Sequence, residues 1–223
     1  MGYETISHYS GSAQINRELN DVLRDGRHVK VLSSRRKVGH PLAPRNKPFY
    51  VTVLINVVRW AAALHEAQNA AWRSGHVALM FWSHTSRRYA SCSITNDPND
   101  RDATELVSPE IENSRQIRRS NTIDLWLYSR KITESQLKNM IKCIQRLHNM
   151  ARYRMFAGSR YSGTFNCVTF VDFVLSSAGP TPFKGLSTGV NPLSMSTPYA
   201  YSLSFSRRNW TCGYRRNHTT IPA

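Results

Sequence analysis

The stretch GHVALMFWSHTSRRYASCSIT, residues 75–95, decides the fold class. Two segments that read as strands, HVALMFW (76–82) and RRYASCSIT (87–95), lie on either side of the polar tetrapeptide SHTS. Runs of this length around a short polar segment predict two antiparallel strands joined by a hairpin turn. We expect the turn to centre near Thr85 and Ser86.

The segments around this hairpin predict further strands and several helices. The runs FYVTVLINVV and TIDLWLYS indicate strands at 49–58 and 122–129. Thr133, followed three residues later by Gln136, is typical of a capping box at a helix start. Helices are therefore expected near Ala13 to Arg24, over 59–73, from Thr133 to about Met150, and from Cys167 to the Ala-Gly-Pro that follows. These elements predict the α+β class, with a small antiparallel sheet packed against helices.

The composition favours one domain with extended ends. We expect a basic N-terminal arm over 1–48, a catalytic domain over 49–180, and a C-terminal extension over 181–223 that wraps the surface of the same domain. The segment 96–114 is polar and acidic, and it is expected to form a surface loop.

The charge of the chain points to an anionic target. Thirty Lys and Arg oppose fourteen Asp and Glu, for a formal net charge of +16. Such an excess attracts nucleic acid, anionic lipid or acidic envelope polymers. The basic residues are dispersed and no nucleic-acid-binding motif accompanies them, so no dedicated nucleic-acid partner is expected. No apolar run reaches eighteen residues, which predicts no transmembrane segment.

The first residues lack the layout of a secretory signal peptide. We therefore expect synthesis in the cytoplasm without a cleaved leader. The four cysteines lie far apart, with no C-x-x-C and no zinc-type spacing. This pattern predicts reduced thiols, no metal site and no cofactor.

The segment GTFNCVTFVDFVLSSAG, residues 163–179, carries the candidate nucleophile. Cys167 stands at the predicted start of an apolar helix, and a helix N-terminus favours a thiolate and offers backbone N–H groups to an oxyanion. The neighbouring positions Asn166 and Val168 are expected beside that oxyanion site. A buried structural role is the common alternative for a single cysteine.

A thiol nucleophile needs a base, and His76 is the best placed of the eight histidines. It follows Gly75 at the start of a predicted strand. In a hairpin centred near residues 85 and 86, position 76 falls opposite 95 or 96, which suggests Asn96 as the residue that orients the imidazole.

GHVALMFW together with the later FNCVTFVDFVL resembles the permuted NlpC/P60 branch of the papain-like cysteine hydrolases. The resemblance covers roughly residues 50–178, with the histidine ahead of the cysteine in permuted order. It implies a papain-like core and hydrolysis of an amide bond in bacterial peptidoglycan. Several type VI secretion effectors look similar. The resemblance therefore also implies an antibacterial toxin that acts in the target cell envelope (periplasm), with a secretion-apparatus carrier and a cognate immunity protein as partners.

Two other functions remain open from the sequence. The same Cys-His pair would serve a lipid acyl hydrolase or acyltransferase acting on an anionic phospholipid. Alternatively, the chain is a non-enzymatic basic module that binds polyanions, and Cys167 is structural.

Overall fold

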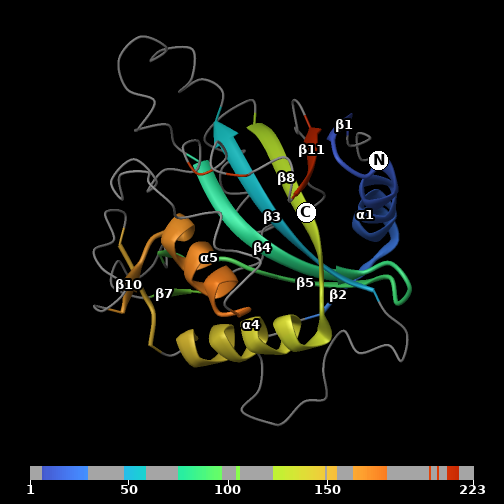
Figure 1. Cartoon of the computed structure of the whole chain (residues 1–223). Helices are drawn as coiled ribbons and strands as arrows, with labels where there is room; N and C mark the ends of the chain where they lie inside the picture. Colours follow the sequence, from blue (N-terminus) through green and yellow to red (C-terminus); the bar gives the residue numbers. More distant parts are fainter. Residues whose placement is uncertain are drawn as a thin grey trace.

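The computed structural model describes residues 7–29, 48–58, 75–96, 104–105, 123–148, 150–154, 163–179, 201, 205 and 210–215. Over these residues the chain is an α+β protein, as predicted, with a mostly antiparallel sheet and helices on both of its faces (Figure 1). The described helices are α1 (Ala13–Asp25), α4 (Glu134–Leu147) and α5 (Cys167–Ser176).

The main sheet has seven strands, of which only the last pair, β5 and β2, is parallel. In spatial order they are β1 (Ser7–Ser10), β11 (Thr211–Arg215), β8 (Ile123–Ile132), β3 (Phe49–Val58), β4 (Gly75–Ser83), β5 (Arg88–Cys92) and β2 (Arg27–His28). Two small ladders stand apart from it: β9 (Arg152–Tyr153) beside β10 (Thr164–Phe165), and β6 (Thr95–Asn96) beside β7 (Thr104–Glu105).

The local signals of the sequence are confirmed. The β4–β5 ladder closes at Ser83 opposite Arg88, so the turn is centred where it was predicted. At the start of α4, the Gln136 amide donates to Thr133 Oγ1 over 3.2 Å, and the Thr133 amide donates to Gln136 Oε1 over 2.9 Å. This is the predicted capping box. The helix predicted over 59–73 lies outside the described residues.

Described segments near both ends of the chain belong to the sheet. The N-terminal segment was predicted as a loosely packed arm with one short helix. Its described part supplies that helix as α1, and also both edge strands, β1 and β2. The C-terminal extension was predicted to wrap the surface, yet β11 lies between β1 and β8, and Trp210 is buried. Of the predicted loop 96–114, the described residues form β7 and the end of β6.

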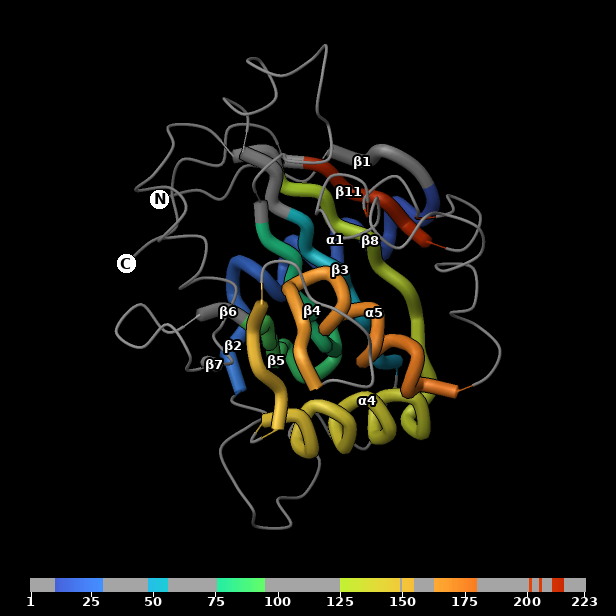
Figure 2. Tube along the Cα trace, turned by 90° about the vertical axis from the view of Figure 1, so that its left-hand side faces the viewer, coloured from blue at the N-terminus to red at the C-terminus, as the bar shows by residue number. Residues whose placement is uncertain are grey.

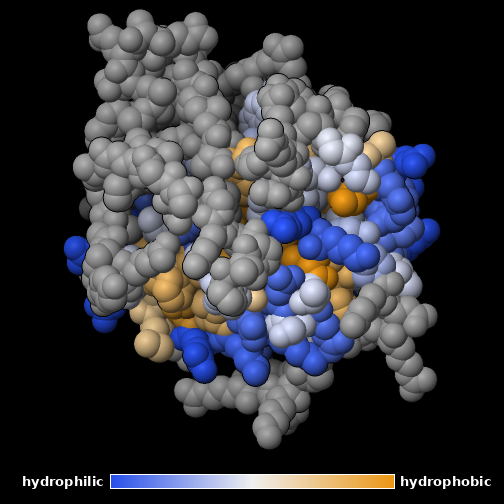
Figure 3. Space-filling view, viewed as in Figure 1, coloured by the Kyte–Doolittle hydropathy of each residue, from blue (hydrophilic) through white to orange (hydrophobic). Residues whose placement is uncertain are grey.

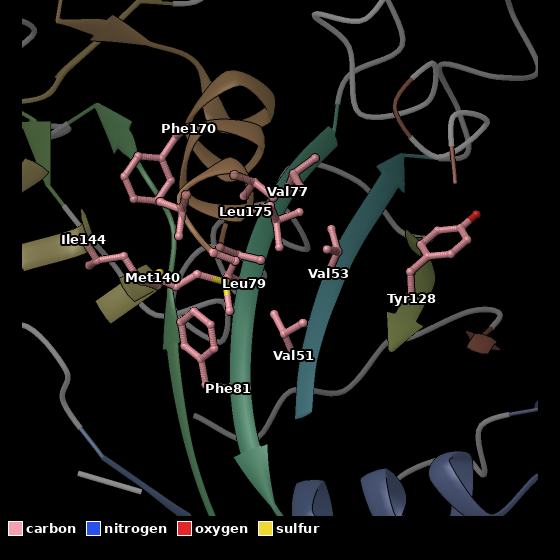
Figure 4. Packing of buried hydrophobic residues seen from close by; sticks show 14 of the residues in the cluster. Val51, Val53, Val77, Leu79, Phe81, Tyr128, Met140, Ile144, Phe170 and Leu175 are labelled. Atoms are coloured by element: carbon pink, nitrogen blue, oxygen red, sulfur yellow. The ribbon is translucent and has the colours of Figure 1, made fainter. Parts of the chain in front are cut away.

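Two hydrophobic cores lie on opposite faces of the sheet. The large core, between the sheet and helices α4 and α5, takes the odd-numbered residues of β4 (Val77, Leu79, Phe81) (Figure 4). The small core lies beneath α1 and takes the even-numbered residues (Ala78, Met80, Trp82). Figure 2 shows α1 and α5 on different sides of the strands. Successive strand residues point to opposite faces of a sheet. The residues from Val77 to Trp82 therefore alternate between the two cores.

Candidate active site

Cys167 is the first residue of α5, and only 6% of its surface is exposed. The residue before it, Asn166, is the N-cap. Asn166 Oδ1 accepts from the Thr169 amide over 2.8 Å, and Thr169 Oγ1 accepts from the Asn166 amide over 2.9 Å. This capping box fixes where the helix begins, so Cys167 is held in its first turn with the positive end of the helix dipole.

Asn166 was predicted beside an oxyanion site, and its observed bonds show that its side-chain oxygen caps the helix. The amide of Val168 lies in the first turn, where helix N–H groups have no acceptor within the helix. Backbone amides of this turn are therefore the donors that α5 offers at Cys167.

The cap at Asn166 yields a stability prediction. Asn166→Ala should lower the free energy of unfolding by about 1–2 kcal/mol, because the Thr169 amide loses its acceptor inside the protein. Asn166→Asp should cost only a few tenths of a kcal/mol, since aspartate is an equally good cap. Urea unfolding measures both. Equal losses for the two variants would show that the cap is not what Asn166 contributes.

The other cysteines of the chain are held as thiols. None of the four forms a disulfide. Burial raises the pKa of Cys92 to about 12, and the neighbouring Cys143 thiol adds to the effect. Burial also raises the pKa of Cys143, against a hydrogen bond with Ser177 and the charge of Arg146. A raised pKa keeps these thiols protonated and poorly nucleophilic at neutral pH. Neither is a candidate nucleophile.

His76 is the second residue of β4, and it is 4% exposed. In the strand register it stands opposite Asn56 of β3, which in turn stands opposite Leu125 of β8. Leu125 belongs to the small core. Strand alternation therefore assigns His76 to the face that carries α1, whereas Cys167 packs in the large core on the other face.

Strand register and core membership therefore place these two side chains on opposite faces of the sheet. Helix α5 packs against β4. For the His76 ring to contact the Cys167 sulfur, the ring would have to reach around the N-terminal end of β4 to the other face of the sheet.

The predicted pairing of residue 76 with residue 96 is wrong. The β4–β5 ladder ends at Leu79 opposite Cys92, and Asn96 pairs with Thr104 in the small β6–β7 ladder. The pairing fails because β5 is short and the chain leaves the sheet after it. The residue opposite His76 is Asn56, which was not among the predicted site residues. In the sequence, Asn56 is recognisable as the one amide side chain in the strand-forming run FYVTVLINVV.

Over the part of the chain that the structure describes, no group of three His, Cys, Asp or Glu side chains could hold a metal ion. Nor does any helix in these ranges combine the length and apolar character needed to cross a membrane. The scan against protein-family models gives no match. Comparison with curated proteins and with solved structures likewise finds none.

Proposed function

We propose that the protein is a thiol-dependent hydrolase with Cys167 as its nucleophile, acting on an amide bond of bacterial peptidoglycan. The observation that carries the proposal is the place of Cys167 in the first turn of a capped helix that packs against β4, the strand whose second residue is His76. A helix N-terminus supplies the two things a thiol nucleophile needs first: a field that favours the thiolate, and N–H donors for an oxyanion.

In this mechanism Cys167 Sγ attacks the carbonyl carbon, and the amides of the first turn of α5 hold the oxyanion. The C–N bond then breaks, and the leaving amine takes its proton from His76. Water attacks the resulting thioester, His76 takes up the proton of that water, and a carboxylate and the thiolate are released. His76 can fill this role only if its ring reaches the sulfur around the N-terminal end of β4.

The resemblance to permuted NlpC/P60 hydrolases supports the same assignment from the sequence, through GHVALMFW and NCVTFV. A papain-like core with the histidine strand ahead of the cysteine helix is part of this proposal. So is a role as an antibacterial toxin delivered to the envelope of a target cell and neutralised by an immunity protein.

The test is digestion of purified peptidoglycan by the wild type and by Cys167→Ala, with the soluble fragments identified by mass spectrometry. We expect fragments that have gained one water across an amide with the wild type only, and a loss of at least about 1,000-fold in the variant. Cys143→Ala is the matched control, because it removes a half-buried thiol from α4 and should keep full activity.

Two outcomes would overturn the proposal. Undiminished digestion by Cys167→Ala would remove the thiol mechanism. Release of fatty acid from anionic phospholipid that depends on Cys167, without peptidoglycan cleavage, would assign the same nucleophile to lipid acyl hydrolysis.

A further inference from the structure

Several basic side chains near α1 and the β4–β5 hairpin turn form ion pairs with acidic side chains of α1. On α1, Arg24 pairs with Asp21 and Asp25 at 3.2 Å, and Arg87 of the hairpin turn lies 3.7 Å from Asp25. His84 of the same turn lies 3.5 Å from Asp21. Arg24 and Arg87 are therefore paired with carboxylates of α1.

Helix α4 presents the opposite case. Its exposed basic residues, Lys138, Lys142 and Arg146, follow one another at intervals of four and so form one ridge along the helix. Lys138 has a partner, Glu134, at 2.7 Å. No acidic side chain of the described residues forms an ion pair with Lys142 or Arg146. Between residues 131 and 154 the sequence contains six basic side chains and a single acidic one.

The ridge is exposed because the apolar face of α4 is turned the other way. Its buried residues pack into the large core, which leaves the basic side chains outside. Figure 3 shows hydrophilic residues along the lower edge of the molecule, where α4 lies in Figure 1, beside an apolar area in the region of α5.

An exposed apolar side chain stands just beyond the C-terminal end of the ridge. Met150 is 72% exposed, and it is the one large hydrophobic residue of the described part of the chain that is exposed. It lies four positions after Arg146, in the turn that follows the end of α4. A basic helix face with an apolar side chain at its border matches the boundary between lipid headgroups and acyl chains. Single-stranded nucleic acid would instead favour exposed aromatic rings, and the described residues show none on this face.

We propose that the ridge Lys138, Lys142 and Arg146, with Met150 beside it, docks the protein on an anionic phospholipid bilayer. The lipid phosphates neutralise the charges of Lys142 and Arg146, and Met150 enters the headgroup boundary. Attraction of this kind grows with the fraction of anionic lipid and weakens with salt, because the charges lie at the surface. The proposal does not depend on the chemistry of Cys167.

The experiment is sedimentation of the full chain with vesicles of phosphatidylcholine, and with vesicles that also contain phosphatidylglycerol. We expect binding to the anionic vesicles only, and release by salt. The double variant Lys142→Glu/Arg146→Glu should weaken this binding by at least about tenfold. Met150→Ser alone should also weaken vesicle binding relative to the wild type, without altering the salt dependence of that binding.

The matched control, Arg17→Glu/Arg88→Glu, makes the same change of net charge at exposed positions away from α4. It should bind nearly as well as the wild type. Equal losses in the two double variants would show a response to net charge alone and overturn the assignment of α4. Vesicle binding unchanged in the α4 variant, with binding of duplex DNA lost, would assign the ridge to nucleic acid instead. Thermal unfolding of each variant confirms that the fold is intact.

Discussion

Replacing Trp82 with alanine should lower the free energy of unfolding by about 3–5 kcal/mol, the largest stability effect we expect from one substitution. Trp82 is fully buried in the small core, where its ring stacks on Tyr50 with centroids 4.2 Å apart and an interplanar angle of 16°. Alanine would leave a cavity between α1 and the sheet. The measurement is urea unfolding followed by circular dichroism, compared at a common denaturant slope.

The indole also carries a hydrogen bond that ties three strands together. Trp82 Nε1 donates to Thr52 Oγ1 over 2.8 Å, and Thr52 Oγ1 lies 2.8 Å from Ser129 Oγ. Trp82→Phe keeps most of the ring and removes only the N–H donor. It should cost about 1–2 kcal/mol, because the two hydroxyls can still bond each other. A loss below about 1 kcal/mol for Trp82→Ala would contradict a small core built around this residue.

The strands that could be predicted are those whose own residues specify them. Strands β3, β4 and β8 are long, and β3 and β4 are mostly apolar. Each of the three contributes residues to both cores, since α1 covers one side of the sheet while α4 and α5 cover the other. In β8, for example, Leu127 enters the small core and Tyr128 the large one. Strands with such strong sequence patterns can be predicted without knowledge of the tertiary structure.

The strands β1 and β11, on one side of the sheet, could not be predicted, because they depend on partners far away in the sequence. Strand β11 has only five residues, TCGYR, with a glycine at its centre. Its extended conformation is stabilised by pairing with β8 on one side and β1 on the other. Both ends of the chain therefore looked like surface segments, since nothing local indicates pairing between residues about two hundred positions apart.

The candidate site divides in the same way. The helix start at Cys167 follows from neighbouring residues, because Asn166 and Thr169 make the cap themselves. Strand alternation also predicts which residues of β4 share a face with His76. It does not predict which face of β4 helix α5 covers. The face that α5 covers is set by long-range packing of the large core. A sequence motif therefore does not determine on which face of the sheet each of its side chains lies.

The His76→Ala variant tests whether the imidazole reaches Cys167 around the end of β4. If it does, hydrolysis should fall by about 100- to 10,000-fold, the usual contribution of a general acid–base group. The reaction of Cys167 with iodoacetamide supplies a second measurement that is independent of substrate. A thiolate held by an imidazolium reacts well below the pH at which an ordinary thiol ionises, which is about 8.5.

In the wild type we therefore expect Cys167 to be alkylated already in mildly acidic solution, and in His76→Ala only as the pH approaches that of an ordinary thiol. Mass spectrometry of the modified peptides separates Cys167 from the other cysteines. His84→Ala is the control, since it removes a half-exposed histidine just beyond the opposite end of the same strand. An alkylation profile unchanged by His76→Ala would mean that β4 separates the two side chains as its alternation indicates. Cys167 would then need a base from the large-core face, and His76 would lose its place in the mechanism.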